Sequence, residues 1–565
     1  MTLTDKSGVQ RSWPAIALFS LMALAACNPA PKYSRPPAPI PTAYKEAPPQ
    51  FKEGTGWVIA QPGDDKLRPK WWEMYKDPQL NALEEQVVIS NQTVKQAEAN
   101  FRAARGLVVT ARSALFPTIG GSAGYTRSHP SANARNIVIG TSGPSSTNTS
   151  GATTASVGSG SFNSYTIAAD ISYTVDFWHR IRNTIAANSY AAQASAADVA
   201  TATLSTHAEL AQDYFEIRAL DAQEGILQDT LKNYRDSLNL TLTLFSAGID
   251  SEQDVTQATT QLDTTKAQAT DLGVARAQFE HAIATLIGKP ASEFSLPVAP
   301  FVPRPPTVPV SLPSELLERR PDIAAAERQI ASANAQIGVA RAAYYPSVSL
   351  SASGGFQSAA VANWFTWPSR LWSIGPSLSQ TLLDFGARRG AVEQSEATYD
   401  AAVASYRQTV LSDFQAVEDN LASIRILAEE ISEYDTAVQS SGRYLELALT
   451  RFRTGVDSYL NVITAQNTLL ANRETQVQAQ LRQMTASVTL IMALGGGWDS
   501  SQFPTYDQLL EKPAKWSPNG PALPKAENAP APPNPPAIPP VSLPPQTPNG
   551  AAADSHTKNP LDKDD

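Results

Sequence analysis

The sequence predicts a mainly α-helical fold with membrane β-strands, in which a long coiled-coil α-helical barrel joins a trimeric 12-stranded transmembrane β-barrel. Two patterns in the 565 residues carry this prediction: most of the 43 prolines are gathered in residues 29–78, 290–321 and 513–560, and four other segments alternate with period two. Because proline inside a helix costs about 3 kcal/mol, long helices need proline-free sequence. The proline-free stretches are residues 79–116, 145–289, 322–345 and 377–503.

The four alternating segments have the pattern of membrane strands. In residues 165–175 the odd positions are aromatic or aliphatic, and most even positions are small and polar. The same alternation starts at Ser347 and at Leu371, and a weaker one covers residues 117–127. Each segment approaches the 9–11 residues that a tilted membrane strand needs. A soluble half-buried strand is the alternative for any single segment, but four matched segments favour the membrane.

The strands also predict an oligomer. Four strands cannot close a membrane barrel, since the smallest known ones have about eight, and open strand edges are not tolerated in lipid. Three copies would supply twelve strands. The Ser/Gly/Thr/Asn-rich loop 129–163 suits the outer surface, and Trp364, Phe365 and Trp367 suit an interfacial belt.

Residues 177–248 and 385–455 predict two long helices of similar length. The second contains an apolar heptad seam with steps of four and three, from Val410 to Ile431; ordinary amphipathic bundle helices are the alternative. Four shorter helices are predicted at 79–116, 249–287, 322–345 and 456–494. Because two short helices end to end approximate one long helix, we expect two long helices and two spliced pairs per chain to line a single tube.

The chain contains an internal repeat. Residues 244–262 match residues 451–469 at an offset of 207, and "DFWHR" at 176–180 resembles "DFGAR" at 384–388 at an offset of 208. The predicted organisation is a lipoprotein signal peptide (1–26), a proline-rich extended arm (27–78), a first repeat (79–289, hairpin 117–176), a connector (290–321), a second repeat (322–498, hairpin 347–383) and a proline-rich disordered tail (499–565).

The N-terminus carries a predicted export signal and lipid attachment site. Lys6 and Arg11 precede an apolar run that is too short to span a bilayer, which is the layout of a secretory signal. The run ends in "LAAC", which resembles a bacterial lipobox, and Cys27 is the only cysteine of the chain. We therefore expect Cys27 to become a lipidated first residue, and Asn28 after it favours export to the outer membrane.

Composition disfavours several functional classes. A net charge of −9 argues against a nucleic-acid partner, and a single cysteine excludes a disulfide framework or a CxxC zinc site. The five histidines form no spaced ligand pair, and we find no nucleophile elbow or phosphate loop. No catalytic residue, cofactor or metal is predicted, and Glu418-Asp419 is interpreted as a solvated helix face.

Several segments resemble the outer-membrane factor family of the TolC and OprM type, in its lipoprotein (NodT-type) branch. They include "WWEMYKDPQLNALEEQ" (71–86), "FRTGVDSYLNVITAQ" (452–466) and, most specifically, residues 316–350 with "ERRPD". The resemblance covers roughly residues 33–498. It implies a homotrimer in the outer membrane of a Gram-negative bacterium, extending into the periplasm. It also implies docking to a periplasmic adaptor (membrane fusion protein) and an inner-membrane pump of the RND or a similar type.

The resemblance also implies functional positions at the helix-turn-helix tips. The tips would face the adaptor and close the periplasmic entrance. Their candidate contacts are Gly248, Asp250, Ser251, Gly455, Asp457 and Ser458, although helix capping is the plain alternative role for the Asp and Ser residues. The candidate pore constriction is Leu460, Asn461 and Thr464. Here Thr464 stands where the family often has an aspartate, so an acidic ring is in doubt, with Asp457 or Asp254 as acids that could compensate.

The expected function is a passive duct that exports small molecules in a tripartite efflux system. The alternatives are the outer-membrane component of type I protein secretion and a coiled-coil structural lipoprotein without a pore.

Overall fold

The computed structural model describes residues 28–41, 43–46, 70–129, 161–306, 308, 319–498, 501 and 503–510. All of these belong to one compact unit, Met1–Leu510. The predicted signal peptide, Cys27, most of the loop 129–163 and the chain after residue 510 lie outside the described residues.

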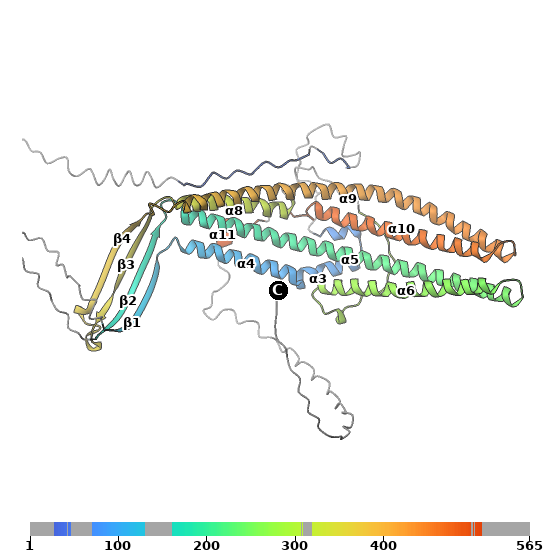
Figure 1. The fold of residues 1–565 in the computed structure, drawn as a ribbon, viewed down its shortest axis with the longest axis horizontal. Coiled ribbons are helices and arrows are strands. Elements are labelled where there is room, and N and C mark those ends of the chain that lie inside the picture. The colour runs from blue at the N-terminus through green and yellow to red at the C-terminus, as the bar shows by residue number, and fades with distance from the viewer. Residues whose placement is uncertain are drawn as a thin grey trace, which may run out of the picture. The chain divides into compact units, whose positions relative to one another are not determined.

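Long helices and a four-stranded sheet form this unit, with the sheet at one end of the helices (Figure 1). In chain order the elements are η1 (Trp71–Tyr75), α3 (Pro78–Ser90), α4 (Gln92–Ser113), β1 (Thr118–Ser128), β2 (Phe162–Val175), α5 (Arg180–Ser246), α6 (Glu252–Leu286), η3 (Ala291–Glu293), α8 (Pro321–Ala342), β3 (Ser347–Ser358), η4 (Val361–Asn363), η5 (Trp367–Ser369), β4 (Arg370–Ser379), α9 (Ala387–Arg453), α10 (Tyr459–Ala493) and α11 (Tyr506–Leu510).

The four predicted strands and both long helices are confirmed. Helices α5 and α9 each have 67 residues, which corresponds to about 100 Å at 1.5 Å per residue. The single helix predicted at 79–116 is wrong, because the helix breaks at Asn91. That residue is extended (ψ 129°), and its side chain accepts a hydrogen bond from the Val94 N–H and so starts α4.

The two halves are equivalent at constant offsets. Every boundary of α5 and α6 recurs 207 residues later in α9 and α10, and every boundary of α4 recurs 229 residues later in α8. The motifs "DFWHR" and "DFGAR" match at an offset of 208, so they are shifted by one residue relative to the helices that follow them. Asp176 accepts the N–H of Arg182, six residues on, whereas Asp384 accepts that of Arg388, four residues on.

The short helices are joined end to end in two equivalent splices. The Asn91 side chain donates to the Leu286 carbonyl at the end of α6 (2.8 Å), and 229 residues later Arg320 donates to the Ala493 carbonyl at the end of α10 (2.8 Å). The spliced pairs are therefore α4 with α6 and α8 with α10. They flank α5, and α9 lies beside α8 and α10 (Figure 1).

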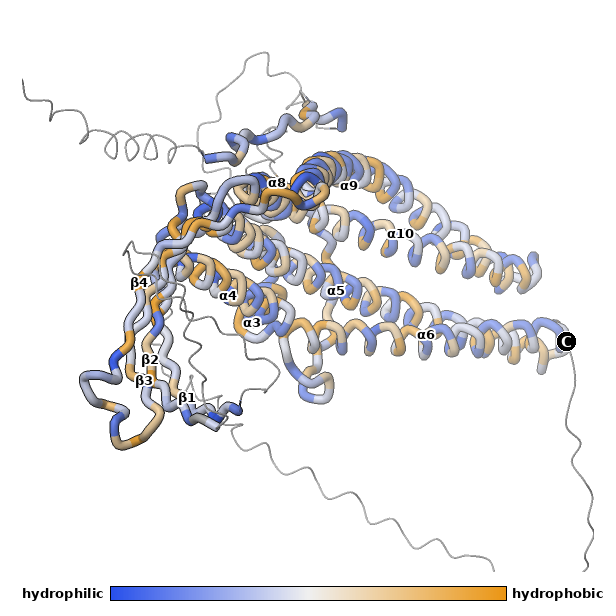
Figure 2. Tube along the Cα trace, turned by 60° about the vertical axis from the view of Figure 1, so that its left-hand side comes forward, coloured by the Kyte–Doolittle hydropathy of each residue, from blue (hydrophilic) through white to orange (hydrophobic). Residues whose placement is uncertain are grey.

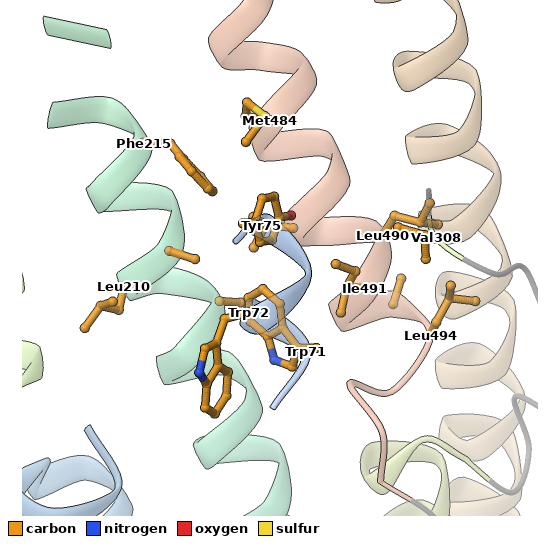
Figure 3. Packing of buried hydrophobic residues seen from close by; sticks show 14 of the residues in the cluster. Trp71, Trp72, Tyr75, Leu210, Phe215, Val308, Met484, Leu490, Ile491 and Leu494 are labelled. Atoms are coloured by element: carbon orange, nitrogen blue, oxygen red, sulfur yellow. The ribbon is translucent and has the colours of Figure 1, made fainter. Parts of the chain in front are cut away.

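The main apolar core lies where these splices meet the long helices. Tyr75 of η1 packs beside Phe215 of α5, with ring centroids 5.0 Å apart, in a cluster that also contains Met484 of α10 (Figure 3). The Tyr75 hydroxyl is 2.8 Å from the Ser487 hydroxyl, and Trp71 is only 1% exposed. The "WWEMY" block is thus an aromatic wedge that fixes α5 against α10.

Glu418, predicted to lie on a solvated helix face, binds the N-terminal arm. This carboxylate accepts the backbone N–H groups of Lys45 (2.7 Å) and Glu46 (3.0 Å). Glu46 also forms an ion pair with Arg425 of α9 (2.7 Å). Glu418 therefore holds the arm on α9 instead of facing only solvent, and the solvated-face interpretation fits only Asp419, which is exposed.

Part of the predicted disordered tail is an ordered strap. Leu509 of α11 is buried against Val108 of α4 and Ala192 of α5, and Phe503 packs under the Arg328 guanidinium, 5.1 Å from the ring centroid. Arg105 donates to the Gln508 carbonyl at 3.1 Å. The prediction of disorder is thus wrong for residues 503–510. The apolar side chains of Phe503 and Leu509, six residues apart, pack on the helices and order this segment.

Candidate functional site

The sheet has two chemically different faces. Its order is β1-β2-β3-β4, all antiparallel. Ile119, Ile171, Ala352 and Ile374 lie opposite one another across the four strands, and directly opposed residues share a face. The large exposed hydrophobic side chains on this face are Ile119, Tyr125, Ile167, Ile171, Leu350, Trp372, Ile374 and Leu378.

The other face carries hydroxyl groups. Ser172 lies opposite Ser351, and the hydroxyls of Ser353 and Ser373 lie 2.8 Å apart. Ser349 and Ser377 form a similar pair at 2.7 Å. This division into an apolar and a small-polar face is the pattern of a membrane strand that has lipid on one side and water on the other.

The outer edges of the sheet are open. Within the described chain, β1 and β4 each have only one neighbouring strand. Since a strand edge in lipid leaves backbone N–H and C=O groups without partners, these edges require further strands.

At the far end of the long helices, two equivalent turns form the tips. Gly248 and Gly455 have φ of 73° and 70°, a conformation that glycine adopts without steric cost. In each turn the glycine N–H bonds the carbonyl three residues back and the next N–H bonds the carbonyl five residues back, which is the Schellman arrangement. The next residues, Ile249 and Val456, are 70% and 65% exposed, so each tip presents an apolar side chain.

The predicted caps differ between the two tips. Ser251 caps α6 by accepting the Asp254 N–H, and burial together with the Asp254 charge raises the pKa of Asp250. Ser458 occupies the N-cap position of α10, but its side chain accepts no capping hydrogen bond. Asp457 instead accepts the Ser458 N–H at 3.0 Å.

Asp457 is committed to neighbours in its own tip. The Asn461 amide and the Arg451 guanidinium (3.1 Å) both donate to it and lower its pKa. Leu460 is 55% exposed and Thr464 is also exposed. The first turns of α10 therefore present an apolar and a hydroxyl side chain, and the nearest acid is already paired with a cation.

Asn28, the residue after the predicted lipid attachment site, is held close to the sheet. Its side-chain oxygen accepts hydrogen bonds from the Asn183 side chain (3.0 Å) and from the Ala30 N–H (3.1 Å). Asn183 lies in the first turn of α5, eight residues after β2 ends. The described arm thus begins at the junction between the sheet and the helices.

A buried charge network holds the connector, and the sequence pattern did not reveal it. Asp221 of α5 binds Arg218 and Arg276, each at 2.8 Å. The two guanidinium groups donate to the Pro297 and Leu296 carbonyls, and Asp221 accepts the Ala299 N–H. The only sequence signal is an i,i+3 charge pair within a long helix, which is also common on solvated surfaces.

The "ERRPD" block is a second such network. Arg320 pairs with Asp322 and, at 2.8 Å, with Asp413 of α9, while Pro321 begins α8. Burial raises the pKa of Asp413 to about 7 although Arg320 opposes the shift. The block therefore joins α8, α9 and the end of α10, which is a structural role.

A third buried pair joins α3 to α5. The Glu84 carboxyl lies 2.6 Å from His207 Nδ1, and Trp72 stacks on the imidazole with ring centroids 4.4 Å apart. Glu84 is 0% and His207 4% exposed. Burial raises the pKa of Glu84 and lowers that of His207 to about 4.

The described residues contain neither a helix suited to cross a bilayer nor a cluster of metal-ligating side chains. None of the helices there has the length and hydrophobicity needed to cross a bilayer, and Figure 2 shows apolar and hydrophilic residues interspersed along them. In the same ranges, no group of three or more His, Cys, Asp and Glu side chains could hold a metal ion.

A sheet with one apolar and one hydroxyl face, open at both edges and continued by helices of about 100 Å, defines a subunit of an oligomeric membrane channel. The sequence model of the outer membrane efflux protein family matches residues 83–289 and 312–496, and the chain belongs to this family. It is an outer-membrane efflux channel subunit, and channels of this family act as trimers in tripartite pumps.

Relatives and solved structures agree with this assignment. The chain is 31% identical over 484 residues to a probable efflux pump outer membrane protein, SepC of Pseudomonas putida, covering 85% of this chain and 96% of that protein. It is 30% identical over 467 residues to the pyoverdine export outer membrane protein OpmQ of Pseudomonas aeruginosa, covering 82% and 94%. The outer-membrane channel OprN superposes with a TM-score of 0.70 at 28% identity, covering 84% and 100%.

Proposed function

We propose that three copies of the chain form a passive duct for small molecules and that the chain itself catalyses no reaction. A periplasmic adaptor would dock at the tips formed by Gly248, Asp250, Ser251, Gly455, Asp457 and Ser458, and an inner-membrane pump of the RND type would supply the driving force. The observation that carries the proposal is the hydroxyl-lined face of the sheet, which hydrates a path without binding a substrate tightly. Relatives named for toluene, solvent and pyoverdine efflux support small-molecule cargo.

Accumulation in cells tests the proposed cargo. Cells lacking the chain should retain more of a small amphipathic dye and of toluene than cells complemented with it. The set of proteins secreted by the two strains should be the same. Loss of one secreted protein with unchanged dye retention would favour type I protein secretion, and no change in either would favour a structural lipoprotein without a pore.

We also propose that Cys27 carries the lipid anchor. Asn28 lies beside the first turn of α5, close to the sheet. An acyl chain on the preceding residue would therefore lie near the membrane that holds the strands. Cys27→Ser should abolish palmitate labelling while the strands still insert. Labelling of the variant equal to that of the wild type would rule out this site.

The proposed constriction at Leu460, Asn461 and Thr464 should select only weakly between cations and anions, because the nearby Asp457 is paired with Arg451. Thr464→Asp places three carboxylates in one ring of the trimer and should raise the preference for K⁺ over Cl⁻. The reversal potential across a bilayer with a KCl gradient measures this. Thr468→Asp, one helical turn further along α10, is the control for an added charge alone. Equal reversal potentials in Thr464→Asp and the wild type would place the constriction elsewhere.

A further inference from the structure

The two β-hairpins carry positive charge in a chain that is acidic as a whole. Residues 117–175 and 347–383 contain one acid, Asp170, no lysine and three arginines: Arg127, Arg135 and Arg370. The whole chain has a net charge of −9. Each hairpin follows a helix and leads into a helix, so its turn lies at the end of the sheet away from the helices (Figure 1). Because the helices extend into the periplasm, this end faces the cell exterior.

Both arginines of the strands lie on the apolar face, near this outer end. Arg370 begins β4 opposite Phe356, which lies opposite Ile167 of the apolar face, and directly opposed residues share a face. Arg127 follows Tyr125 by two positions near the end of β1, and residues two apart in a strand point to the same side. Both arginines are exposed. Two guanidinium groups therefore belong to the surface that faces lipid.

The sheet supplies no carboxylate to neutralise these arginines. The one acid of the strands, Asp170, lies opposite Ser353 on the hydroxyl face. A neighbouring copy has the same sequence, so its strands bring no acid to the apolar face either. A charge on the lipid face is costly at the membrane midplane and costs little near the interface. A partner of opposite charge for Arg127 and Arg370 must therefore come from the membrane surface around the strands.

Aromatic side chains place the arginines at the depth of the lipid headgroups. The rings of Tyr125 and Tyr165 have centroids 4.8 Å apart, and Trp364 lies 5.6 Å from Tyr165. Tryptophan and tyrosine collect at the membrane–water interface. The Arg370 guanidinium lies 3.0 Å from the centroid of the Trp367 ring. A guanidinium stacked on a ring keeps the N–H donors at the edge of its plane for other partners.

We propose that Arg127 and Arg370 form a cationic rim that binds the phosphate groups of glycolipids in the outer leaflet. Arginine fits a phosphate in charge and in geometry, because its planar fork donates two N–H bonds to two oxygens. A lipid also supplies acyl chains, which cover apolar side chains deeper in the membrane such as Ile167 and Trp372. The rim thereby holds ordered lipid around the channel and fixes the depth of the sheet in the membrane.

Titration of the full-length protein in detergent micelles with bisphosphorylated lipid A, read by native mass spectrometry, tests the proposal. Arg127→Gln and Arg370→Gln should each weaken binding about fivefold, the contribution of one arginine near an anionic lipid surface. The double variant should bind more weakly than either, and Arg127→Lys/Arg370→Lys should restore most of the binding. Arg443→Gln is the matched control, because it removes one exposed positive charge near the far end of α9, and it should bind like the wild type.

Two further arms identify the ligand, and the mass of each complex shows whether a variant has assembled. Lipid A without its phosphates should bind the wild type as weakly as bisphosphorylated lipid A binds the double Gln variant. Excess inorganic phosphate should displace little lipid, because it lacks the acyl chains that cover the apolar face. Wild-type binding by the double Gln variant would overturn the proposal, as would equal binding of lipid A with and without phosphates. Complete displacement by inorganic phosphate would assign the arginines to a free anion and contradict the lipid.

Discussion

Asp221→Ala should lower the free energy of unfolding by about 3–5 kcal/mol, the loss expected when one partner is removed from a buried charge network. The Asp221 side chain is 1% exposed and binds two guanidinium groups and one backbone N–H. Without it Arg218, which is almost as buried, keeps a charge with no opposing carboxylate. Guanidinium denaturation of the detergent-solubilised protein at fixed concentration measures the change.

Asp263→Ala is the matched control, because Asp263 forms an i,i+3 ion pair with Lys266 at the same 2.8 Å but on the surface. An exposed pair contributes about 0–1 kcal/mol, so this variant should be almost neutral. The connector also gives a local readout: in Asp221→Ala, proteolysis should become faster near residues 294–299. Similar losses of stability in the two variants would show that the network does not hold the connector.

The wild type should become less stable as the pH rises above 6.5. Glu84→Gln should remove this loss of stability. The folded pair with His207 holds one proton, because burial raises the Glu84 pKa and lowers the His207 pKa to about 4. Between the ordinary pKa values, about 4.5 and 6.5, the unfolded pair also holds one proton, on the histidine. In this window the contribution of the pair to stability does not depend on pH.

Outside this window the proton counts differ. Above pH 6.5 the unfolded histidine loses its proton while the folded pair keeps one on the buried Glu84, so stability falls as pH rises. Below pH 4.5 the unfolded pair binds a second proton that the folded pair resists down to about pH 4, so stability falls there too.

In Glu84→Gln only the histidine titrates, and the loss above pH 6.5 should disappear. The difference in unfolding free energy between wild type and variant, measured at pH 6 and pH 8, cancels the other titrating groups. An unchanged difference at the two pH values would contradict a shared proton.

Most of the fold could be predicted because its signals are local. Residues 385–455 lack proline and form α9 (Ala387–Arg453), and the alternation that starts at Ser347 forms β3. The break at Asn91 was missed because asparagine is neither proline nor glycine, and because its amide also donates to the Leu286 carbonyl of a helix that is distant in the sequence. The ordered segment 503–510 was missed because its proline-rich surroundings predicted disorder.

Other predictions were wrong because the side chains concerned interact with residues that are far away in the sequence or compete locally. Glu418 binds the backbone of residues more than 370 positions earlier, and no local pattern distinguishes it from Asp419 beside it. At the second tip the Ser458 side chain accepts no capping hydrogen bond and Asp457 accepts the Ser458 N–H, a difference from the first tip that composition does not reveal. The tip and constriction residues could be located from the sequence, but their function stays a prediction.

The conductance of the purified protein in planar bilayers tests the central claim most directly. If three chains form a water-filled duct with a hydroxyl-lined wall, the trimer should produce discrete conductance steps, and monomer separated by denaturation should produce none. Trimer that inserts into the bilayer and passes no ions, even after loosening of the tips by Arg451→Ala, would contradict the duct.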